Sequence, residues 1–185
     1  MPGDLTEDAL LDGRVRLRQP ARGYRVAIDP LLLAAAVPVR AGETVLDLGT
    51  GVGAAALCCA TRVPGCRVVG LEIQEELADL ARGNAALNGI ADAVRIVAGD
   101  IAAPPASIAR DAFDHVMANP PFGTPGTGSP SPDRSKQVAN VEGESRVADW
   151  VSAAVRAVKP GGTITFIHRA DRLRDLLAAL DAAAG

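Results

Sequence analysis

The sequence contains few aromatic, sulfur-bearing and imidazole side chains. Aromatic residues make up 3% of the 185 residues, there are three cysteines, and the only histidines are His115 and His168. An odd cysteine count without a C-x-x-C pair argues against a disulfide framework, so we expect buried thiols in a reducing compartment. Because both histidines fall in predicted strands, we also predict that the protein holds no metal.

No apolar run is long enough to span a membrane, and the first ten residues, MPGDLTEDAL, do not resemble a signal peptide. We therefore expect a cytoplasmic protein that does not act at a membrane. The length fits one ordinary domain, and 48% of the residues are apolar. The net charge of −3 gives no bulk attraction for nucleic acid, so a polyanionic partner would need a local basic patch.

Such a patch is present near the N-terminus. Residues 14–18 read RVRLR, which places Val15 and Leu17 on one face of a strand and three arginines, Arg14, Arg16 and Arg18, on the other. Arg22 and Arg25 follow, and residues 24–28 could form the second strand of a small hairpin. The alternative for the arginine run is a solvated strand face without a partner.

A helix should follow this hairpin. Asp29 precedes Pro30, which predicts a cap and the first residue of a helix that ends at Pro38. We therefore expect residues 1–40 to form an extension, a short hairpin plus a helix, before a core over residues 41–185.

The core alternates apolar strands with helices, which is typical of a doubly wound, mostly parallel α/β sheet of Rossmann-like type. The expected strands are 44–50, 67–73, 94–100, 113–120 and 163–169. The expected helices are 53–62, 74–89, 146–158 and 171–183, with a short helical stretch before Arg110 and a turn at 159–162. In such a sheet, ligands bind at the carboxyl edge. Residues 122–135, rich in Gly, Pro and Ser, should form a long loop.

Three motifs fall at the expected strand ends. The first, Asp47 to Gly53 (DLGTGVG), permits a tight turn and a close backbone approach to a ligand. By itself it also fits a dinucleotide fingerprint. Glu72 ends the next strand, where its carboxylate could bind the ribose hydroxyls of a dinucleotide or of another cofactor that contains a ribose. The second motif, Gly99-Asp100, ends the third strand. Asp100 could accept a hydrogen bond from an adenine amine or cap a helix in the next segment.

The third motif, Asn119-Pro120-Pro121-Phe122, ends the fourth strand. Proline cannot continue a central strand, and the two prolines stiffen the turn while leaving their carbonyls free. Asn119 adds an amide oxygen, so two acceptors at a fixed separation lie next to an aromatic ring. This arrangement suits a planar group that bears an NH2, although alone it would fit a rigid turn equally well.

Taken in this order, the motifs over residues 44–169 resemble the class I S-adenosylmethionine-dependent methyltransferases that modify amino groups. The resemblance implies that the turn binds the methionine part of S-adenosylmethionine, with Asp47, Gly49, Thr50, Gly51 and Gly53 as its residues. It also implies that Glu72 holds the ribose, Ile73 packs on the adenine, Asp100 takes the adenine amine, and Asn119 to Phe122 form the acceptor site.

A narrower resemblance rests on QPARGYRVAIDPLLLAAAV before the glycine motif and on VEGE, KPGG and IHRADRL after it. These segments look like those of bacterial tRNA adenine-N(6) methyltransferases that act on valine tRNA. The resemblance implies a tRNA adenine as substrate. RNA contacts would then come from the arginines at 14, 16 and 18, from Tyr24, and from Arg134 and Lys136 in the long loop.

Other functions fit parts of the pattern. A protein glutamine amide and a guanine amine in rRNA are also planar NH2 groups. A nicotinamide-dependent oxidoreductase would explain the glycine turn but not Asn119 to Phe122, and a non-catalytic RNA-binding module could keep the fold. The resembled family has seven strands and only five are found here, so we expect a core that lacks the last two strands, as in a C-terminally truncated chain.

Overall fold

A computed structural model describes the chain over residues 4–22, 25–121 and 147–184. Its strands are β1 (Leu5–Leu10), β2 (Val15–Pro20), β3 (Thr44–Leu48), β4 (Arg67–Glu72), β5 (Val94–Ala98), β6 (Phe113–Ala118) and β7 (Val158–Phe166). Its helices are α1 (Asp29–Ala36), α2 (Ala54–Arg62), α3 (Glu75–Leu87), α5 (Val147–Ala157) and α6 (Leu173–Ala184), with a short 3-10 turn η2 (Ala170–Arg172) before α6.

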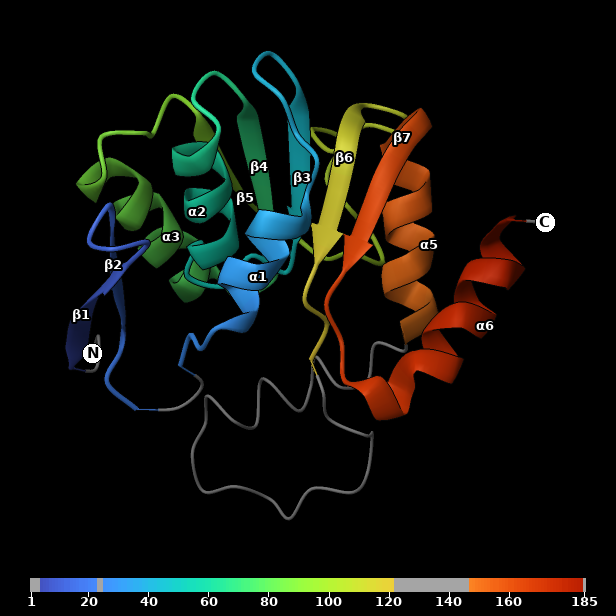
Figure 1. The fold of residues 1–185 in the computed structure, drawn as a ribbon, viewed down its shortest axis with the longest axis horizontal. Coiled ribbons are helices and arrows are strands. Elements are labelled where there is room, and N and C mark those ends of the chain that lie inside the picture. Colours follow the sequence, from blue (N-terminus) through green and yellow to red (C-terminus); the bar gives the residue numbers. More distant parts are fainter. Residues whose placement is uncertain (1–3, 23–24, 122–146, 185) are drawn as a thin grey trace.

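The main sheet has five parallel strands in the order β5-β4-β3-β6-β7, with β5 and β7 at its edges (Figure 1). The predicted doubly wound α/β fold is therefore confirmed, as are the positions of the five strands. The order reverses between β3 and β6, because β3 leads to β4 on one side and β6 lies on the other. A doubly wound sheet places its ligand crevice at this reversal.

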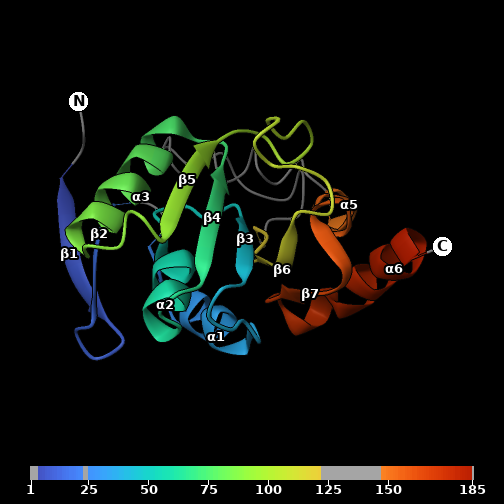
Figure 2. The same ribbon diagram turned by 90° about the horizontal axis from the view of Figure 1, so that it is seen from above.

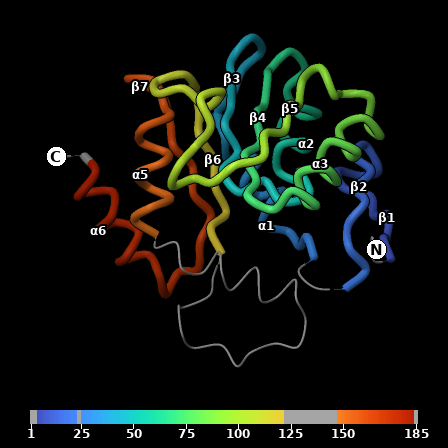
Figure 3. Tube along the Cα trace, turned by 180° about the vertical axis from the view of Figure 1, so that it is seen from behind, coloured from blue at the N-terminus to red at the C-terminus, as the bar shows by residue number. Residues whose placement is uncertain are grey.

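Alternate side chains of each strand enter two separate cores. Val45 and Met117 face the core formed with α1, α2, α3 and the hairpin, whereas Leu46 and Val116 face the core formed with α5. Figures 1 and 3 view the molecule from these two faces. The period-two alternation of the strands thus buries both faces, as expected for a parallel sheet.

The N-terminal hairpin pairs different segments from those we predicted. β2 contains the expected RVRLR strand, but its antiparallel partner is β1, whose Leu10 pairs with Val15 and whose Leu5 pairs with Pro20. Residues 25–28 form no strand. The acidic start of the chain is the better partner because Glu7 and Asp8 bond the arginines that β2 and the following segment present. Figure 2 shows the hairpin beside α3 at one end of the molecule and α6 at the other end.

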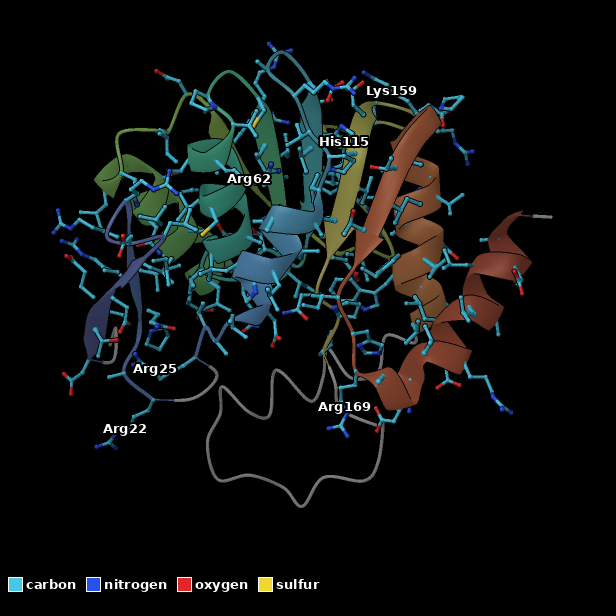
Figure 4. All side chains as sticks on the ribbon, viewed as in Figure 1. Arg22, Arg25, Arg62, His115, Lys159 and Arg169 are labelled. Atoms are coloured by element: carbon cyan, nitrogen blue, oxygen red, sulfur yellow. The ribbon has the colours of Figure 1, made fainter. Side chains whose placement is uncertain are left out.

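Helix α1 starts one residue earlier than predicted. Ile28 is the N-cap and Asp29 lies in the first turn, where its charge suits the helix dipole without capping a backbone amide. At the other end, Arg62 of α2 donates to the carbonyls of Ala34 and Val37, at 3.1 and 2.6 Å. These bonds join α1 to α2, and Figure 4 shows Arg62 between the two helices.

Two other local predictions were wrong. The segment 101–112 forms bends and turns instead of a short helix. Residues 159–162 belong to β7, where a shift in register between Phe113 and His115 accommodates the extra residues. Gly161, with a φ of +79°, allows the chain to bulge there and rejoin the sheet.

His115 lies at the amino edge of the sheet, with Lys159 nearby, as Figure 4 shows. Its Nε2 is 2.9 Å from Glu43 Oε2 and its Nδ1 is 2.7 Å from Thr163 Oγ1. Lys159 bonds Asp114 at 2.6 Å, which lowers the pKa of that carboxyl. These polar contacts hold β3, β6 and β7 together at the edge opposite the strand ends that bear the sequence motifs.

The three cysteines are buried free thiols, as predicted. None of the helices that the structure describes is long and apolar enough to cross a membrane.

We predict that the hairpin is an integral part of the core. Leu17 is 0% exposed and packs with α2 and α3, so Leu17→Ala should lower the free energy of unfolding by about 2–5 kcal/mol. Urea denaturation measures this change, and Arg16→Ala on the exposed face of the same strand is the control. Equal, small losses for both variants would show that the hairpin is a loose arm.

Candidate active site

The motif residues meet where β3, β4 and β6 end. In the parallel register, Leu48 of β3 pairs with Leu71 of β4 on one side and with Ala118 of β6 on the other. Gly49, Glu72 and Asn119 are the next residues of these three strands. The structure therefore brings together the glycine turn, the acidic strand end and the Asn-Pro-Pro corner that the sequence placed far apart.

The glycine turn is bound to the neighbouring strand by its backbone. Gly49 N and Thr50 N both donate to the carbonyl of Leu71, at 2.8 and 3.0 Å. Gly49, Gly51 and Gly53 have φ values of +66°, +57° and +89°, which is the left-handed region that favours glycine. The turn therefore needs glycine at three of its positions for backbone reasons alone.

Gly49 is also needed because Trp150 packs against it. A Cβ at Gly49 would lie 2.5 Å from Trp150 Cη2, a distance that no real contact permits. Trp150 is 4% exposed, so its ring belongs to the core on this side of the sheet. The only sequence signal was its apolar helical face, and that pattern does not reveal which segment the ring contacts.

Asp47 is buried beneath the turn. Its Oδ2 accepts a hydrogen bond from Thr50 Oγ1 at 2.6 Å, and the backbone amide of Ala56 in α2 also donates to its carboxyl group. Burial, with a smaller contribution from the charge of Glu72, raises the pKa of Asp47 to about 7. The methyl group of Thr50 lies over Gly70, where a Cβ would come within 2.7 Å, so close packing fixes Thr50 as well.

Glu72 is 2% exposed and joins the turn to the start of α3. Its Oε2 accepts from Gly51 N at 2.8 Å, and its Oε1 accepts from Gln74 N at 2.9 Å. Burial raises the pKa of Glu72, while the bonds from the backbone amides of Gln74 and Gly51 oppose this shift. Each carboxylate oxygen keeps a further lone pair for a ligand hydroxyl.

Two buried carboxyl groups beside one glycine turn favour a cationic ligand over an anionic one. The pyrophosphate of a dinucleotide at this turn would disfavour the ionised form of both acids further. A ligand with a sulfonium and an ammonium group would instead stabilise the ionised carboxylates. The electrostatics thus favour the cationic one of the two kinds of cofactor that the glycine motif leaves open, while Glu72 suits the ribose of both.

Ile73 and Asp100 border this crevice. Ile73 is 52% exposed, so an apolar side chain stands in solvent directly after Glu72. Gly99, next to Asp100, donates its backbone N–H to the carbonyl of Glu72 at 2.8 Å, which places the two acidic strand ends side by side. Asp100 Oδ1 accepts from Ala102 N at 2.9 Å, which is a local turn contact, and the segment that follows forms no helix for Asp100 to cap.

The Asn-Pro-Pro corner presents an acceptor that no described residue uses. Asn119 Oδ1 is buried and has no hydrogen-bond partner among the described residues. Buried polar atoms are almost always paired, so an acceptor at this edge of the sheet that no described residue satisfies is a candidate site for a donor from a ligand. Pro120 is buried at the same corner. Just before this corner, Ile167 N donates to the carbonyl of Ala118 at 3.1 Å and so joins the end of β6 to the residue after β7.

The predicted basic patch largely pairs with acids of its own hairpin. Arg16 and Arg18 both bond Glu7, at 2.6 and 3.0 Å, and Arg25 bonds Asp8 at 2.9 Å. Arg14 donates to the carbonyl of Leu11 at 3.2 Å. The arginine side chains are exposed as expected, but their positive charge is partly cancelled.

Several predicted contact residues lie outside the described residues, namely Tyr24, Phe122, Arg134, Lys136 and the rest of the long loop. Over residues 4–22, 25–121 and 147–184, no group of three or more His, Cys, Asp or Glu side chains is placed to hold a metal ion.

This fold and this site define an S-adenosylmethionine-dependent methyltransferase. The chain belongs to the methyltransferase small domain family, whose sequence profile matches residues 25–133.

Known proteins resemble the chain in sequence and in fold. A tRNA1(Val) (adenine(37)-N6)-methyltransferase of Porphyromonas gingivalis is 33% identical over 182 residues, which cover 95% of this chain and 69% of that protein. A release factor glutamine methyltransferase of Chlorobaculum tepidum is 36% identical over 80 residues, which cover 43% of this chain and 27% of that protein. A predicted O-methyltransferase of Agrobacterium tumefaciens has a similar structure, with a TM-score of 0.64 and 25% identity over 82% of this chain and 66% of that one.

We predict that Asp47→Asn stabilises the free protein more at pH 8 than at pH 5. The pKa of Asp47 rises from its ordinary 3.8 to about 7 on folding. The folded state therefore keeps a proton that the unfolded chain has lost, and stability falls as the pH rises from about 4 to about 7. Asparagine has no such titration and can still accept from Thr50.

Thermal unfolding at both pH values measures this effect, with each kcal/mol corresponding to about 2–4 °C in Tm. Asp79→Asn, at an exposed position of α3, is the control for general charge effects. The same Tm difference between variant and wild type at pH 5 and at pH 8 would contradict the buried titration.

Proposed function

We propose that the chain methylates the exocyclic amine of adenine in RNA, with tRNA as the substrate class, and that it acts in the cytoplasm. The observation that supports this most is the buried Asn119 Oδ1 beside the glycine turn, which has no hydrogen-bond partner within residues 4–22, 25–121 and 147–184. An amine that donates to this oxygen and to the neighbouring Pro120 carbonyl would lie next to the cofactor crevice. The chain spans about two thirds of the tRNA methyltransferase that it resembles.

The proposed cofactor contacts come from the carboxyl ends of three neighbouring strands, β3, β4 and β5. The glycine turn, with Asp47, Gly49, Thr50, Gly51 and Gly53, would hold the methionine part. Glu72 would accept from the ribose hydroxyls, and Ile73 would cover the adenine with the apolar side chain that it exposes. Asp100 would accept from the adenine amine of the cofactor.

The acceptor corner would activate the substrate amine. Bound S-adenosylmethionine supplies a methyl group on a sulfonium, which is a strong electrophile. An adenine amine is a weak nucleophile because its lone pair is delocalised into the ring. Hydrogen bonds from its two hydrogens to Asn119 Oδ1 and the Pro120 carbonyl would localise that pair on nitrogen and stabilise the positive charge that develops there. The rigid prolines would fix the amine in line for transfer, and Phe122 would stack on the base.

RNA contacts are proposed for the exposed arginines of the hairpin, Arg14, Arg16 and Arg18, together with Tyr24, Arg134 and Lys136. A guanidinium has five N–H donors, so an arginine bonded to Glu7 can still contact a phosphate. Glu7 and Asp8 cancel part of the positive charge of these arginines. We therefore expect shape complementarity and the Asn119 acceptor site to contribute more to RNA binding than electrostatic attraction does.

The acceptor assignment predicts the effect of Asn119 variants. Asn119→Ala should lower methyl transfer to tRNA at least about a hundredfold, because the amine loses a fixed acceptor in the transition state. Asn119→Asp keeps an oxygen in place and should retain more activity than Asn119→Ala. Transfer from labelled S-adenosylmethionine, followed by nucleoside analysis for N6-methyladenosine, measures both variants.

The cofactor affinity of Asn119→Ala, measured by calorimetry, should stay within a few-fold of the wild type. Methyl transfer by Asn119→Ala within a few-fold of the wild-type rate would sink the acceptor assignment. Methylation of a protein glutamine instead of RNA by the wild type would leave the corner's role intact but replace the substrate.

The ribose assignment predicts a separate result. Glu72→Ala should weaken S-adenosylmethionine binding at least tenfold, since two ribose hydroxyls and the Gly51 amide lose their acceptor. Isothermal titration calorimetry measures this affinity, and Glu75→Ala, an exposed acid on the first turn of α3, is the control. Equal affinities for both variants would refute the role of Glu72.

A further inference from the structure

Two asparagine side chains of α3 bond the edge of β2 that does not pair with β1. Asn84 Oδ1 accepts from Arg18 N and its Nδ2 donates to Arg18 O, both at 2.8 Å. Asn88 repeats this arrangement one helical turn later, accepting from Arg16 N at 2.8 Å and donating to Arg16 O at 2.7 Å. The two amides thus bond β2 as a third strand would.

The spacing of the two asparagines explains why this works. Four residues of an α-helix rise about 6 Å, and two residues of a strand span about 6.8 Å. Side chains at i and i+4 on α3 therefore meet alternate residues of β2, whose backbone groups point to the same edge. A primary amide has both a donor and an acceptor, so it can satisfy the N–H and the C=O of one strand residue at once.

Asn84 has a further contact that Asn88 lacks. Its second amide hydrogen bonds the carbonyl of Val52, in the glycine turn, at 2.9 Å. The second hydrogen of Asn88 instead bonds the carbonyl of Asn84 within α3 at 2.8 Å. Asn84 is 0% exposed, so a single buried amide connects the hairpin backbone to the glycine turn.

The same face of α3 packs tightly against the turn. A Cβ at Gly53 would lie 3.3 Å from the Cβ of Ala81, one turn before Asn84 on the helix. Val52 stands between Gly51 and Gly53, which both have positive φ and little intrinsic stiffness. A fixed partner for the Val52 carbonyl therefore limits the conformations that the turn can adopt.

We propose that Asn84 is a positioning residue that couples the N-terminal hairpin to the glycine turn. This inference rests on the proposed role of the turn in holding S-adenosylmethionine. With Asn84 in place, the turn is ordered before the cofactor arrives, so less ordering entropy is lost on binding. Coupling is reciprocal, so the cofactor also stabilises the hairpin, which bears the arginines proposed to contact RNA.

The test compares Asn84→Ala with Asn88→Ala in the full chain. Each variant loses two bonds to the β2 backbone, to Arg18 in Asn84→Ala and to Arg16 in Asn88→Ala. Only Asn84→Ala also loses the bond to Val52. Amide hydrogen exchange at Arg16 and Arg18 should rise in both variants. S-adenosylmethionine affinity by calorimetry, measured well below each Tm, should fall about tenfold in Asn84→Ala and stay within twofold of wild type in Asn88→Ala. Equal affinities for the two variants would overturn the inference.

The wild-type protein gives a second reading that does not depend on the folding of a variant. Saturating S-adenosylhomocysteine should slow amide exchange at Arg18 more than at Asp114, which bonds at the opposite edge of the sheet. No preferential slowing at Arg18 would overturn the coupling even if Asn84→Ala did not fold. Failure of the wild type to methylate RNA would instead count against the proposed function, because the cofactor measurements use no RNA.

Discussion

The site depends on the register that places the ends of β3 and β6 side by side. Leu48 pairs with Ala118, so the glycine turn and the Asn-Pro-Pro corner leave the sheet at the same level. A register shifted by one residue would turn Asn119 to the other face of the sheet, since side chains alternate along a strand. The two buried cores, one on each side of β3 and β6, make such a shift costly because it would exchange their two sets of apolar side chains and disrupt the packing of both.

Beside these strand ends, two buried carboxyl groups favour the binding of a cation. Asp47 and Glu72 are nearly inaccessible, and desolvation raises the pKa of both. The protein offsets part of that cost with the Thr50 hydroxyl and the amides of Gly51 and Gln74. A ligand with positive charge relieves the rest, whereas the pyrophosphate of a nicotinamide dinucleotide would add to it. Site electrostatics therefore favour one of two cofactors that share one glycine pattern.

Much of the fold followed from local patterns, because the five parallel strands are apolar runs and most of the segments between them contain an amphipathic helix. The order of the motifs at their carboxyl ends also predicted which residues would meet, and Gly49, Glu72 and Asn119 do follow paired strand ends. These inferences succeed because strand direction and the position of an acidic or proline residue after an apolar run are both visible in sequence.

The remaining features depend on contacts between distant segments. β1 was overlooked as the partner of β2 because half of LTEDAL is polar and its ion pairs with the arginines of β2 are not visible in the sequence. The role of Asn84 and Asn88 was not visible, since asparagines on a helix usually indicate a solvated face. The contact between Trp150 and Gly49 was not visible either, because it depends on how α5 crosses the sheet.

A crystal structure of the protein with S-adenosylhomocysteine and adenosine monophosphate tests the central claim most directly. The account predicts that the homocysteine sulfur faces Asn119 Oδ1, with the adenine amine of the nucleotide between them and about 3–3.5 Å from the place of the transferred methyl. A sulfur on the far side of the glycine turn, or an Asn119 oxygen bonded to the protein instead of the amine, would contradict it.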